Sequence, residues 1–346
     1  MRNRMSTHSS LLTTESTDAT EDYRISSVAL VFSVVNRIEY CPGRLAALDG
    51  AHMRHVVIIG ARGQLGTDLQ PVLGGYRVTG LLHGDLDVCD LERARGVLGE
   101  LRPDVVVNTS AYHKVDVCED EPAASFAVNA SGAYNLARLA TALDFTLVHF
   151  SSDYVFAGDA RVPYREDDLA APQSVYGVSK LAGENLVRAF CRRHFVIRTT
   201  GLYGVAGASG KGGNFVETMI RLGTAGAVRV VDDQVMTPTA TADLARAVAA
   251  LLDREARGDL AYGLYHITSA GQCSWYFFSK TIFELCGMDV VLSPITTAES
   301  GSKARRPAFS ALDHGKWMAA GFAELRPWRE ALADYLRAKG HVSAGR

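Results

Sequence analysis

From residue 53 onward, short runs of apolar residues alternate with longer stretches in which apolar residues recur every three or four positions. Six short runs predict buried strands, at residues 55–60 (HVVIIG), 76–82 (YRVTGLL), 86–90 (LDVCD), 103–110 (PDVVVNTS), 145–152 (FTLVHFSS) and 195–200 (FVIRTT). The longer stretches predict helices over residues 64–73, 91–101, 121–143 and 175–192. Strands that alternate with helices pair in parallel through right-handed crossovers. The pattern therefore predicts an α/β fold with a Rossmann-like, doubly wound parallel sheet.

The regular alternation ends near residue 200. Beyond it, glycines cluster in GVAGASGKGGNF, and the pattern predicts a strand over 228–233 and helices over 216–222, 241–253, 273–287 and 327–340. We interpret residues 53–200 as mainly the sheet domain, and residues 201–340 as mainly a smaller C-terminal substrate-binding lobe. The two parts are expected to interleave.

Residues 1–52 differ from the rest of the chain. They are rich in Ser, Thr and acids without a helical or strand period, which is typical of a disordered extension. The apolar run at 28–35 is much shorter than the roughly 20 residues of a membrane helix, and the acids before it argue against a secretory leader. We expect folding to begin at Met53, so the preceding segment is either disordered or reflects a misassigned start codon.

The composition excludes several classes of protein. A net charge of −2 leaves no basic excess to neutralise phosphates, so no nucleic-acid partner is expected. The six cysteines include no CxxC pair, and no His, Asp, Glu or Cys cluster has metal-ligand spacing. We therefore expect no disulfide framework and no metal, and a reducing cytoplasm as the location.

The segment GARGQLG follows the first predicted strand and opens the first predicted helix. It spaces Gly60, Gly63 and Gly66 for a tight turn and for close backbone approach to a diphosphate. The N–H groups and dipole at the start of the helix attract the same anion. The loop, including Gln64 and Leu65, therefore predicts a dinucleotide site in the sheet domain.

The residues after the second predicted strand indicate which dinucleotide binds. An acid there would bind the ribose hydroxyls of NAD, but Leu82 and His83 stand at that point. Arg62 lies in the glycine loop, where it can reach a 2′-phosphate. We predict NADPH, with NADH as an alternative, and expect Asp87 and Val88 to border the adenine.

Tyr176 and Lys180 stand four residues apart at the start of a predicted helix, so both side chains share one helix face. A free tyrosine has a pKa near 10, and a nearby ammonium group would bring it toward neutral pH. Ser152, at the end of a predicted strand, can hydrogen-bond a reacting carbonyl. The three residues predict a proton-transfer site beside a hydride donor.

Several segments together resemble the extended short-chain dehydrogenase/reductases, and within them the dTDP-4-dehydrorhamnose reductase family. They are GARGQLG, NTSAYHKVDVCEDEP, SSDYVF, PYREDDLAAPQSVYGVSKLAGE, GGNFVETMIRL, VVDDQVMTPTATADLA, GLYHITSAGQCSWYFFS and RRPAFSALD. The resemblance implies catalytic roles for Ser152, Tyr176 and Lys180, with the tyrosine and lysine also contacting the cofactor. It further implies dinucleotide contacts at Ala111 and Tyr112, and substrate contacts at Ser152, Asn214, Gln234 and Arg306.

By this resemblance, the expected reaction is the NADPH-dependent reduction of the C4 keto group of dTDP-4-dehydro-β-L-rhamnose. The substrate side departs from the family pattern at Gly201, where a Trp is usual, at His113 and Lys114, and at residues 235–237. Two alternatives stay open: a reductase of another nucleotide-activated keto sugar, and a non-catalytic dinucleotide-binding subunit resembling methionine adenosyltransferase β. An epimerase or dehydratase fits less well.

The expected partner is a nucleotide sugar, with no membrane and a homodimer as a further hypothesis. His266 and Trp275 also match the family segments, but their spacing fits packing. We expect both to be core residues of the small lobe.

Overall fold

Six parallel strands form the central sheet. Their order is β10 (Gly263–His266), β5 (His194–Thr199), β4 (Thr146–Ser152), β3 (Val105–Asn108), β1 (His55–Ile59) and β2 (Arg77–Leu81). The computed structural model describes residues 53–207 and 213–342, and the expectation for residues 1–52 lies outside them. Because β1 lies inside the sheet and the strands are added on both sides of it, the crossover helices cover both faces.

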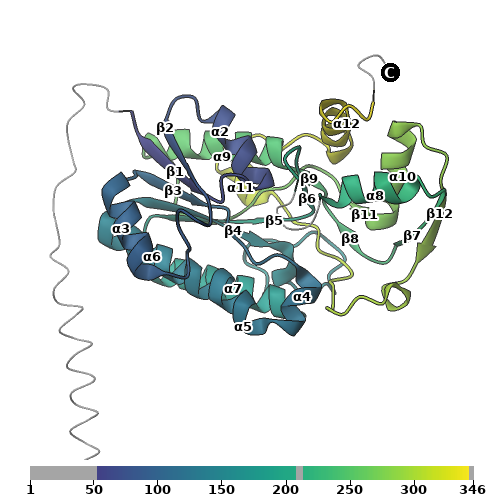
Figure 1. Cartoon of the computed structure of the whole chain (residues 1–346), viewed down its shortest axis with the longest axis horizontal. Coiled ribbons are helices and arrows are strands. Elements are labelled where there is room, and N and C mark those ends of the chain that lie inside the picture. Colours follow the sequence, from purple (N-terminus) through teal and green to yellow (C-terminus); the bar gives the residue numbers. More distant parts are fainter. Residues whose placement is uncertain (1–52, 208–212, 343–346) are drawn as a thin grey trace, which may run out of the picture. The chain divides into compact units, whose positions relative to one another are not determined.

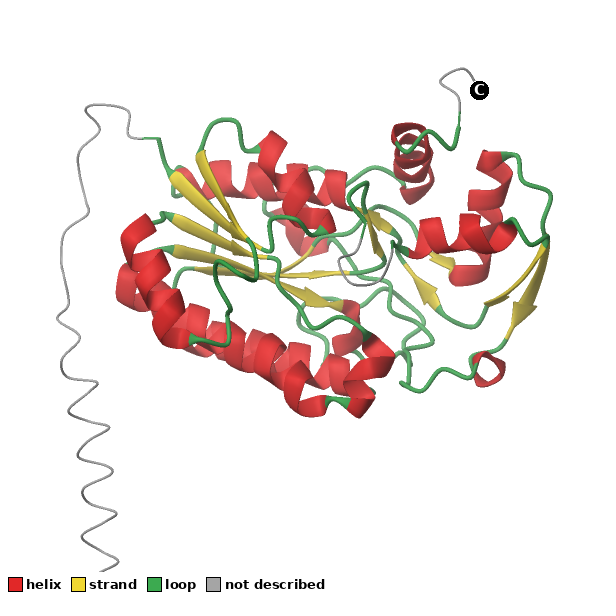
Figure 2. Cartoon of the chain, in the orientation of Figure 1, coloured by secondary structure: helices red, strands yellow, loops and turns green. Residues whose placement is uncertain are grey.

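Two layers of helices enclose the sheet (Figures 1 and 2). One layer contains α2 (Gln64–Val72), α9 (Thr241–Ala256) and α11 (Gly315–Ala319), and the other contains α3 (Leu91–Leu101), α6 (Ala133–Leu143) and α7 (Val175–Phe190). Within β1, Val56 and Ile58 pack toward the first layer, whereas Val57 and Ile59 pack toward the second. Burial on both faces explains the continuous apolar runs, and the predicted doubly wound α/β fold is confirmed.

The third predicted strand, LDVCD, is wrong. The Asp87 carboxylate accepts the N–H of Cys89 at 2.9 Å, and Asp90 caps the first turn of α3. Aspartates compete for backbone N–H groups in this way, and so favour turns and caps over strands. Leu86 and Val88 are nevertheless buried in the core beside α3, which produced the alternating pattern.

The long helix predicted over residues 121–143 is interrupted. The short helix α4 (Val115–Asp120) is followed by α5 (Pro122–Phe126), a π-helical segment (Ala127–Gly132) and then α6. In the π-helical segment, the Asn129 amide exchanges hydrogen bonds with the backbone of Tyr112, at 2.9 and 3.0 Å. These bonds hold the loop after β3 against the helix. Helix propensity alone could not have predicted the change of pitch at this point, because propensity does not include such a contact with a distant loop.

The smaller lobe has its own apolar core. It contains α8 (Phe215–Gly223), α10 (Trp275–Cys286), α12 (Trp328–Ala338), and the paired strands β7 (Ala227–Val231) and β12 (Val291–Ile295). Two short strand pairs complete it: β8 (Val235–Met236) with β11 (Cys273–Ser274), and β6 (Leu202–Tyr203) with β9 (Thr239–Ala240). The segments interleave, since α9, β10 and α11 lie after residue 201 in sequence but pack in the sheet domain.

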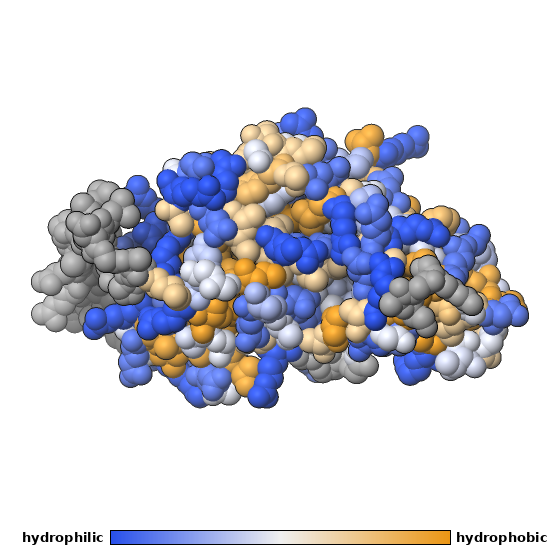
Figure 3. Space-filling model, turned by 90° about the horizontal axis from the view of Figure 1, so that it is seen from above, coloured by the Kyte–Doolittle hydropathy of each residue, from blue (hydrophilic) through white to orange (hydrophobic). Residues whose placement is uncertain are grey.

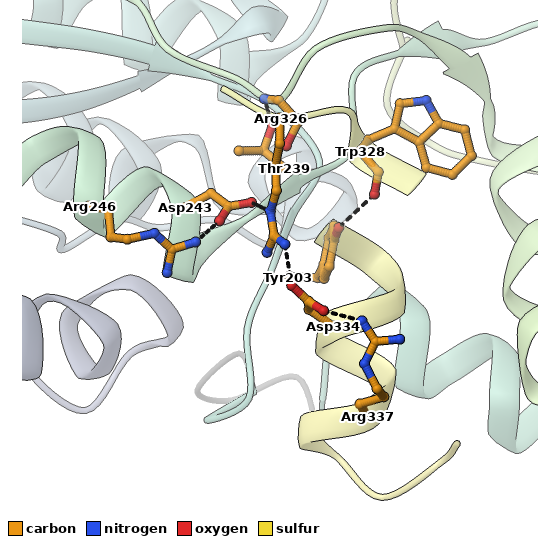
Figure 4. A network of polar contacts seen from close by, with 9 residues as sticks. Tyr203, Thr239, Asp243, Arg246, Arg326, Trp328, Asp334 and Arg337 are labelled. Carbon is orange, nitrogen blue, oxygen red and sulfur yellow. Dashed lines mark hydrogen bonds and ion pairs between the residues drawn. The ribbon is translucent and has the colours of Figure 1, made fainter. Parts of the chain in front are cut away.

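A charged network ties α12 to α9 (Figure 4). Arg326 donates from Nε to the buried Asp243 carboxylate of α9 at 2.9 Å, and from Nη1 to Asp334 of α12. Arg246 and Arg337 pair with the same two carboxylates. Arg326 thus bridges Asp243 of α9 and Asp334 of α12, which links the last helix of the small lobe to the sheet domain.

The surface is predominantly polar where Figure 3 shows it. Seen from above, hydrophilic side chains cover most of the face, with apolar residues in small groups between them. Among residues 53–207 and 213–342, no helix has both the length and the apolar character needed to cross a membrane.

Replacing Arg326 by Ala should lower the free energy of unfolding by about 1–3 kcal/mol, because the buried Asp243 carboxylate loses a bonded cation. Urea unfolding followed by circular dichroism measures the change. The matched control is Arg329→Ala, which removes a pair with Glu284 in which both side chains are about half exposed. That variant should change stability by less than about 0.5 kcal/mol. Equal effects of the two substitutions would contradict the bridging role of Arg326.

Candidate active site

A cavity of about 1010 Å³ lies at the carboxyl ends of the sheet strands. Its walls include Gly60, Arg62 and Gly63 after β1, Leu82 and His83 after β2, residues 109–111 after β3, residues 151–154 after β4 and residues 199–202 after β5. The small lobe adds Asn214, Phe215 and Trp275. Parallel strands bring all of these loops to one edge, which is where open α/β sheets bind ligands.

The glycine loop is packed against its own backbone and against the end of β3. Gly60 has φ +84°, and a Cβ atom there would lie 2.6 Å from Thr109 Oγ1. A Cβ atom on Gly66 would lie 2.3 Å from the carbonyl oxygen of Gly60. The N-cap residue of α2, Gly63, has no side chain to cap the first N–H groups, so the start of this helix presents them at the cavity. This arrangement fits a diphosphate.

One end of the cavity carries an arginine and a histidine. Arg62 and His83 are exposed and both line it, beside Leu82. Asp85, the nearest acid after β2, accepts the N–H of Leu82 at 2.8 Å and is not part of the lining. Asp87 and Val88, which are expected to border the adenine, also line the cavity. A phosphate on the ribose would therefore meet the Arg62 guanidinium and the His83 imidazole here.

Tyr176 reaches Ser152 because α7 begins very close to the end of β4. Ser174 caps α7 by accepting the N–H of Gly177 at 3.2 Å. A Cβ atom on Gly177 would lie 2.2 Å from the carbonyl oxygen of Tyr154, so only glycine permits this approach. The Tyr176 hydroxyl then hydrogen-bonds with Ser152, and its ring packs edge-on against Tyr154 at 5.7 Å.

Lys180 lies one turn further along α7 and is 2% exposed. Its Nζ donates to the carbonyl oxygen of Phe150 at 2.6 Å. Burial lowers the pKa of Lys180 to about 8, against the opposing effect of Glu184. Burial raises the pKa of Tyr176, and the hydrogen bond with Ser152 opposes that rise. Desolvation thus disfavours the charged form of each group.

Most of the residues expected at the site line this cavity. They are Gly60, Arg62, Gly63, Gln64, Leu65, Asp87, Val88, Ala111, Ser152, Tyr176, Lys180 and Asn214. Four expected residues are not part of the lining. Gly66 packs behind the loop, and the Tyr112 hydroxyl donates to Glu121. Gln234 is 3% exposed and donates to Thr297 at 2.8 Å, while Arg306 pairs with Asp116 at 2.8 Å.

Sequence reasoning missed part of the substrate side. Trp275 was expected in the core; it does pack against Phe215, with ring centroids 4.4 Å apart, but both rings also line the cavity. A signal for this was available, because Trp275 is the first residue of α10 and Phe215 is the first residue of α8, and both are therefore at helix ends. His266 is fully buried and is a core residue, as expected, although it lies in β10 of the sheet domain rather than in the small lobe.

Gly201, the main departure from the family pattern, also lines the cavity. Its φ is +57°, and a Cβ atom would lie 3.1 Å from Met236 Sδ and from Pro238 Cα. A side chain at this position would be strained, so Gly201 leaves that wall of the cavity bare. Within the described ranges, no three His, Cys, Asp or Glu side chains are grouped so that they could hold a metal ion.

Comparisons with known proteins agree on one family. Residues 53–340 match the family model described as RmlD substrate binding domain. The chain is 41% identical over 283 residues to a dTDP-4-dehydrorhamnose reductase of Streptomyces griseus, covering 80% of this chain and 91% of that protein. It is also 41% identical over 283 residues to a probable dTDP-4,6-dihydroxy-2-methyloxan-3-one 4-ketoreductase of Streptomyces antibioticus, covering 80% and 93%.

A solved structure is similar as well. The dTDP-4-dehydrorhamnose reductase of Bacillus anthracis, crystallised in complex with NADP, is 36% identical and has a TM-score of 0.77. The match covers 83% of this chain and 100% of that one. The likeness therefore extends over both the sheet domain and the small lobe.

Replacing Gly66 by Ala should abolish dinucleotide binding or weaken it by at least about 10-fold, because the added methyl group displaces the loop that presents the helix N–H groups. Quenching of tryptophan fluorescence by NADPH measures the affinity. The control is Gly99→Ala in α3, where an added Cβ meets nothing within 4 Å and binding should be unchanged. Parental affinity in Gly66→Ala would show that the loop does not bind the diphosphate.

Proposed function

The chain belongs to the dTDP-4-dehydrorhamnose reductase family, and from this premise we propose that it reduces the C4 keto group of dTDP-4-dehydro-β-L-rhamnose with NADPH. The product is dTDP-L-rhamnose. One observation carries the proposal: Ser152, Tyr176 and Lys180 meet in the cavity that begins at the glycine loop. The names of the relatives and the NADP complex of a structural neighbour support the same reaction.

The cavity fits a dinucleotide along its length. The dinucleotide, when bound, supplies the hydride. The uncapped start of α2 would hold the diphosphate, and Arg62 with His83 would hold a 2′-phosphate. Lys180 would donate to the hydroxyls of the nicotinamide ribose. With donor and acceptor held in one cavity, much of the entropic barrier to the reaction is removed.

The titration of the two helix residues suits the reductive direction. Burial raises the pKa of Tyr176, so its hydroxyl keeps its proton at neutral pH and can give it to the developing alkoxide. Below its pKa of about 8, Lys180 is a cation that can stabilise the phenolate left behind. Tyr176 is therefore the general acid and Lys180 its electrostatic partner.

A second candidate is the reduction of a different dTDP-linked keto sugar. The ketoreductase of Streptomyces antibioticus is as similar to this chain as the reductase of Streptomyces griseus. The bare wall at Gly201 lies on the substrate side, which is where a change of sugar would be accommodated. The hydride and proton chemistry is the same in both candidates.

A cytoplasmic location and a homodimer are parts of the proposal. Cys89, Cys191, Cys273 and Cys286 are free thiols, which suits a reducing compartment. Gel filtration with light scattering tests the dimer.

The deciding experiment is NADPH oxidation with dTDP-4-dehydro-β-L-rhamnose, compared with a panel of other dTDP and UDP keto sugars. The proposal expects the highest kcat/KM with the rhamnose precursor. Another preferred sugar would favour the second candidate. Dinucleotide binding without turnover of any keto sugar would favour the regulatory-subunit alternative.

Tyr176→Phe should lower kcat by about 10²-fold or more while leaving NADPH affinity nearly unchanged, because the proton donor is lost but the ring stays. Steady-state kinetics and fluorescence titration measure the two effects. Tyr134→Phe, a tyrosine of α6 outside the cavity lining, is the matched control and should keep parental kcat. Full activity of Tyr176→Phe would remove this residue from the mechanism.

The pH profile of kcat/KM for NADPH should be flat below pH 8 and fall above it. The cation at Lys180 is present below its folded-state pKa of about 8 and is lost as pH rises through that value. In Lys180→Arg the guanidinium stays protonated, so this alkaline limb should disappear even if the plateau is lower. The same limb in the variant would assign the titration to another group.

Arg62→Ser should lower kcat/KM with NADPH by about 10-fold or more, because a charge-assisted contact to the 2′-phosphate is lost. The value with NADH should change little. Arg95→Ser, on the exposed side of α3, is the control. An equal loss with both cofactors would contradict the assignment.

A further inference from the structure

The Asp153 carboxylate lies directly behind Ser152 and is enclosed by hydroxyl groups. Its Oδ1 accepts from Ser152 at 2.8 Å, and its Oδ2 accepts from Thr200 at 2.7 Å and from Ser310 at 2.6 Å. The side chain is 2% exposed. Burial raises the pKa of Asp153, and the three hydroxyl groups oppose that rise. A buried carboxylate is retained at such a position only when donors compensate its desolvation.

The three donors come from three separate parts of the chain. Ser152 ends β4 and Thr200 directly follows β5, so these two belong to the sheet domain. Ser310 belongs to residues 301–313, which we call the strap. Figure 1 shows this segment leaving the small lobe after β12 and passing close to α4. Asp153 is thus the point at which the strap meets the catalytic serine.

The strap contacts both lobes. On the small-lobe side, Ser310 N–H donates to the carbonyl oxygen of Val235 in β8 at 2.8 Å. On the sheet side, Arg306 and Lys303 pair with acids of α4. Because the strap spans the two lobes, a change in their separation would be felt at Ser310.

The bonds around Ser152 show how its hydroxyl is held. A serine hydroxyl has one proton and two lone pairs. The proton is given to Asp153, and one lone pair accepts the N–H of Tyr154 at 3.2 Å. These two bonds fix the oxygen of Ser152 beside Tyr176, with which it interacts. Asp153 therefore decides how the serine hydroxyl is aligned at the cavity.

The same contacts argue against an elimination role for Asp153. An acid that removes a proton from substrate must reach the cavity with a free oxygen. Although Asp153 is among the residues that line the cavity, both of its oxygens already accept hydroxyl protons and it is 2% exposed. The residue acts on the reaction only through its neighbours.

We propose that Asp153 is a positioning residue that fixes the hydroxyl of Ser152 and makes its alignment depend on docking of the strap at Ser310. The proposal rests on the proposed function, since it concerns the alignment of Ser152 beside the proton donor of that reaction. It predicts that Ser310, which is not part of the cavity lining, controls kcat. Substrate that draws the two lobes together would dock the strap at Ser310 and align the hydroxyl of Ser152 in the same step.

The first test compares two substitutions at Ser310. Ser310→Ala should lower kcat for the keto sugar by about 10-fold, the scale of a small misalignment, while the Kd for NADPH stays unchanged. Ser310→Thr keeps the hydroxyl and should restore kcat most of the way. Arg305→Gln is the control, because it changes an exposed side chain of the strap and should leave kcat unchanged. Parental kcat in Ser310→Ala would overturn the proposal.

The decisive test is a double-mutant cycle with Ser152→Ala. If Ser310 acts through the serine, Ser310→Ala should have no further effect on kcat once Ser152 is absent. An equal fold-loss in both backgrounds would mean that Ser310 acts by another route, and the proposal would be wrong. Tyr176→Phe separates the two levels of failure: if that variant is fully active, the proposed function itself has failed.

Asp153→Asn covers the case in which Ser310→Ala does not fold. Asn keeps one oxygen for Thr200 and Ser310 but turns an N–H toward Ser152, which reverses that hydrogen bond. We expect a folded protein, by its melting temperature, with unchanged Kd for NADPH and a kcat at least about 10-fold lower. Parental kcat in this variant would likewise contradict the proposal.

Discussion

The close approach of α7 to the end of β4 is the contact on which the site depends. Gly177 lies against the carbonyl oxygen of Tyr154 with no room for a Cβ atom, and this brings Tyr176 to Ser152. The parallel sheet supplies the second half of the arrangement, since it carries the glycine loop after β1 to the same edge as the end of β4. Tyr176 and the glycine loop thus face one cavity although they are more than a hundred residues apart in sequence.

Desolvation sets the electrostatics of that cavity. It favours the protonated form of Tyr176, and it lowers the pKa of Lys180 to about 8, so that the ammonium form persists only below that pH. Asp153 shows the third outcome of burial. There, three hydroxyl groups surround a carboxylate that cannot reach solvent. Burial therefore acts on Tyr176, Lys180 and Asp153 alike, and the result differs with the hydrogen-bond partners of each group.

Two sets of contacts join the small lobe to the sheet domain. Arg326 links α12 to α9 through two carboxylates, and the strap links β12 to α4 and, through Asp153, to Ser152 (Figures 1 and 4). A third link runs from Gln64 in the glycine loop to the Asn214 amide at 3.2 Å. These contacts hold the two lobes together on either side of the cavity, which suits a reaction that needs both ligands in contact.

The sequence by itself determined the parallel sheet, the glycine loop after its first strand, and the helix face that carries Tyr176 and Lys180. Apolar runs buried on both faces indicated a parallel sheet, the glycine spacing indicated the dinucleotide loop, and the spacing of Tyr176 and Lys180 indicated one helix face. These features are local, so periodicity and turn chemistry can report them. The strand predicted at LDVCD failed because side-chain capping by Asp87 and Asp90 overrode the apolar alternation.

Only the tertiary structure decided which distant side chains meet. It brought Trp275 and Phe215 to the substrate wall, took Arg306 to Asp116, and placed Ser310 on Asp153. Each of these contacts joins residues more than fifty positions apart, and the last two connect the strap to the sheet domain. No local pattern encodes them, because they are set by packing between distant segments and not by the preferences of the residues within any one segment.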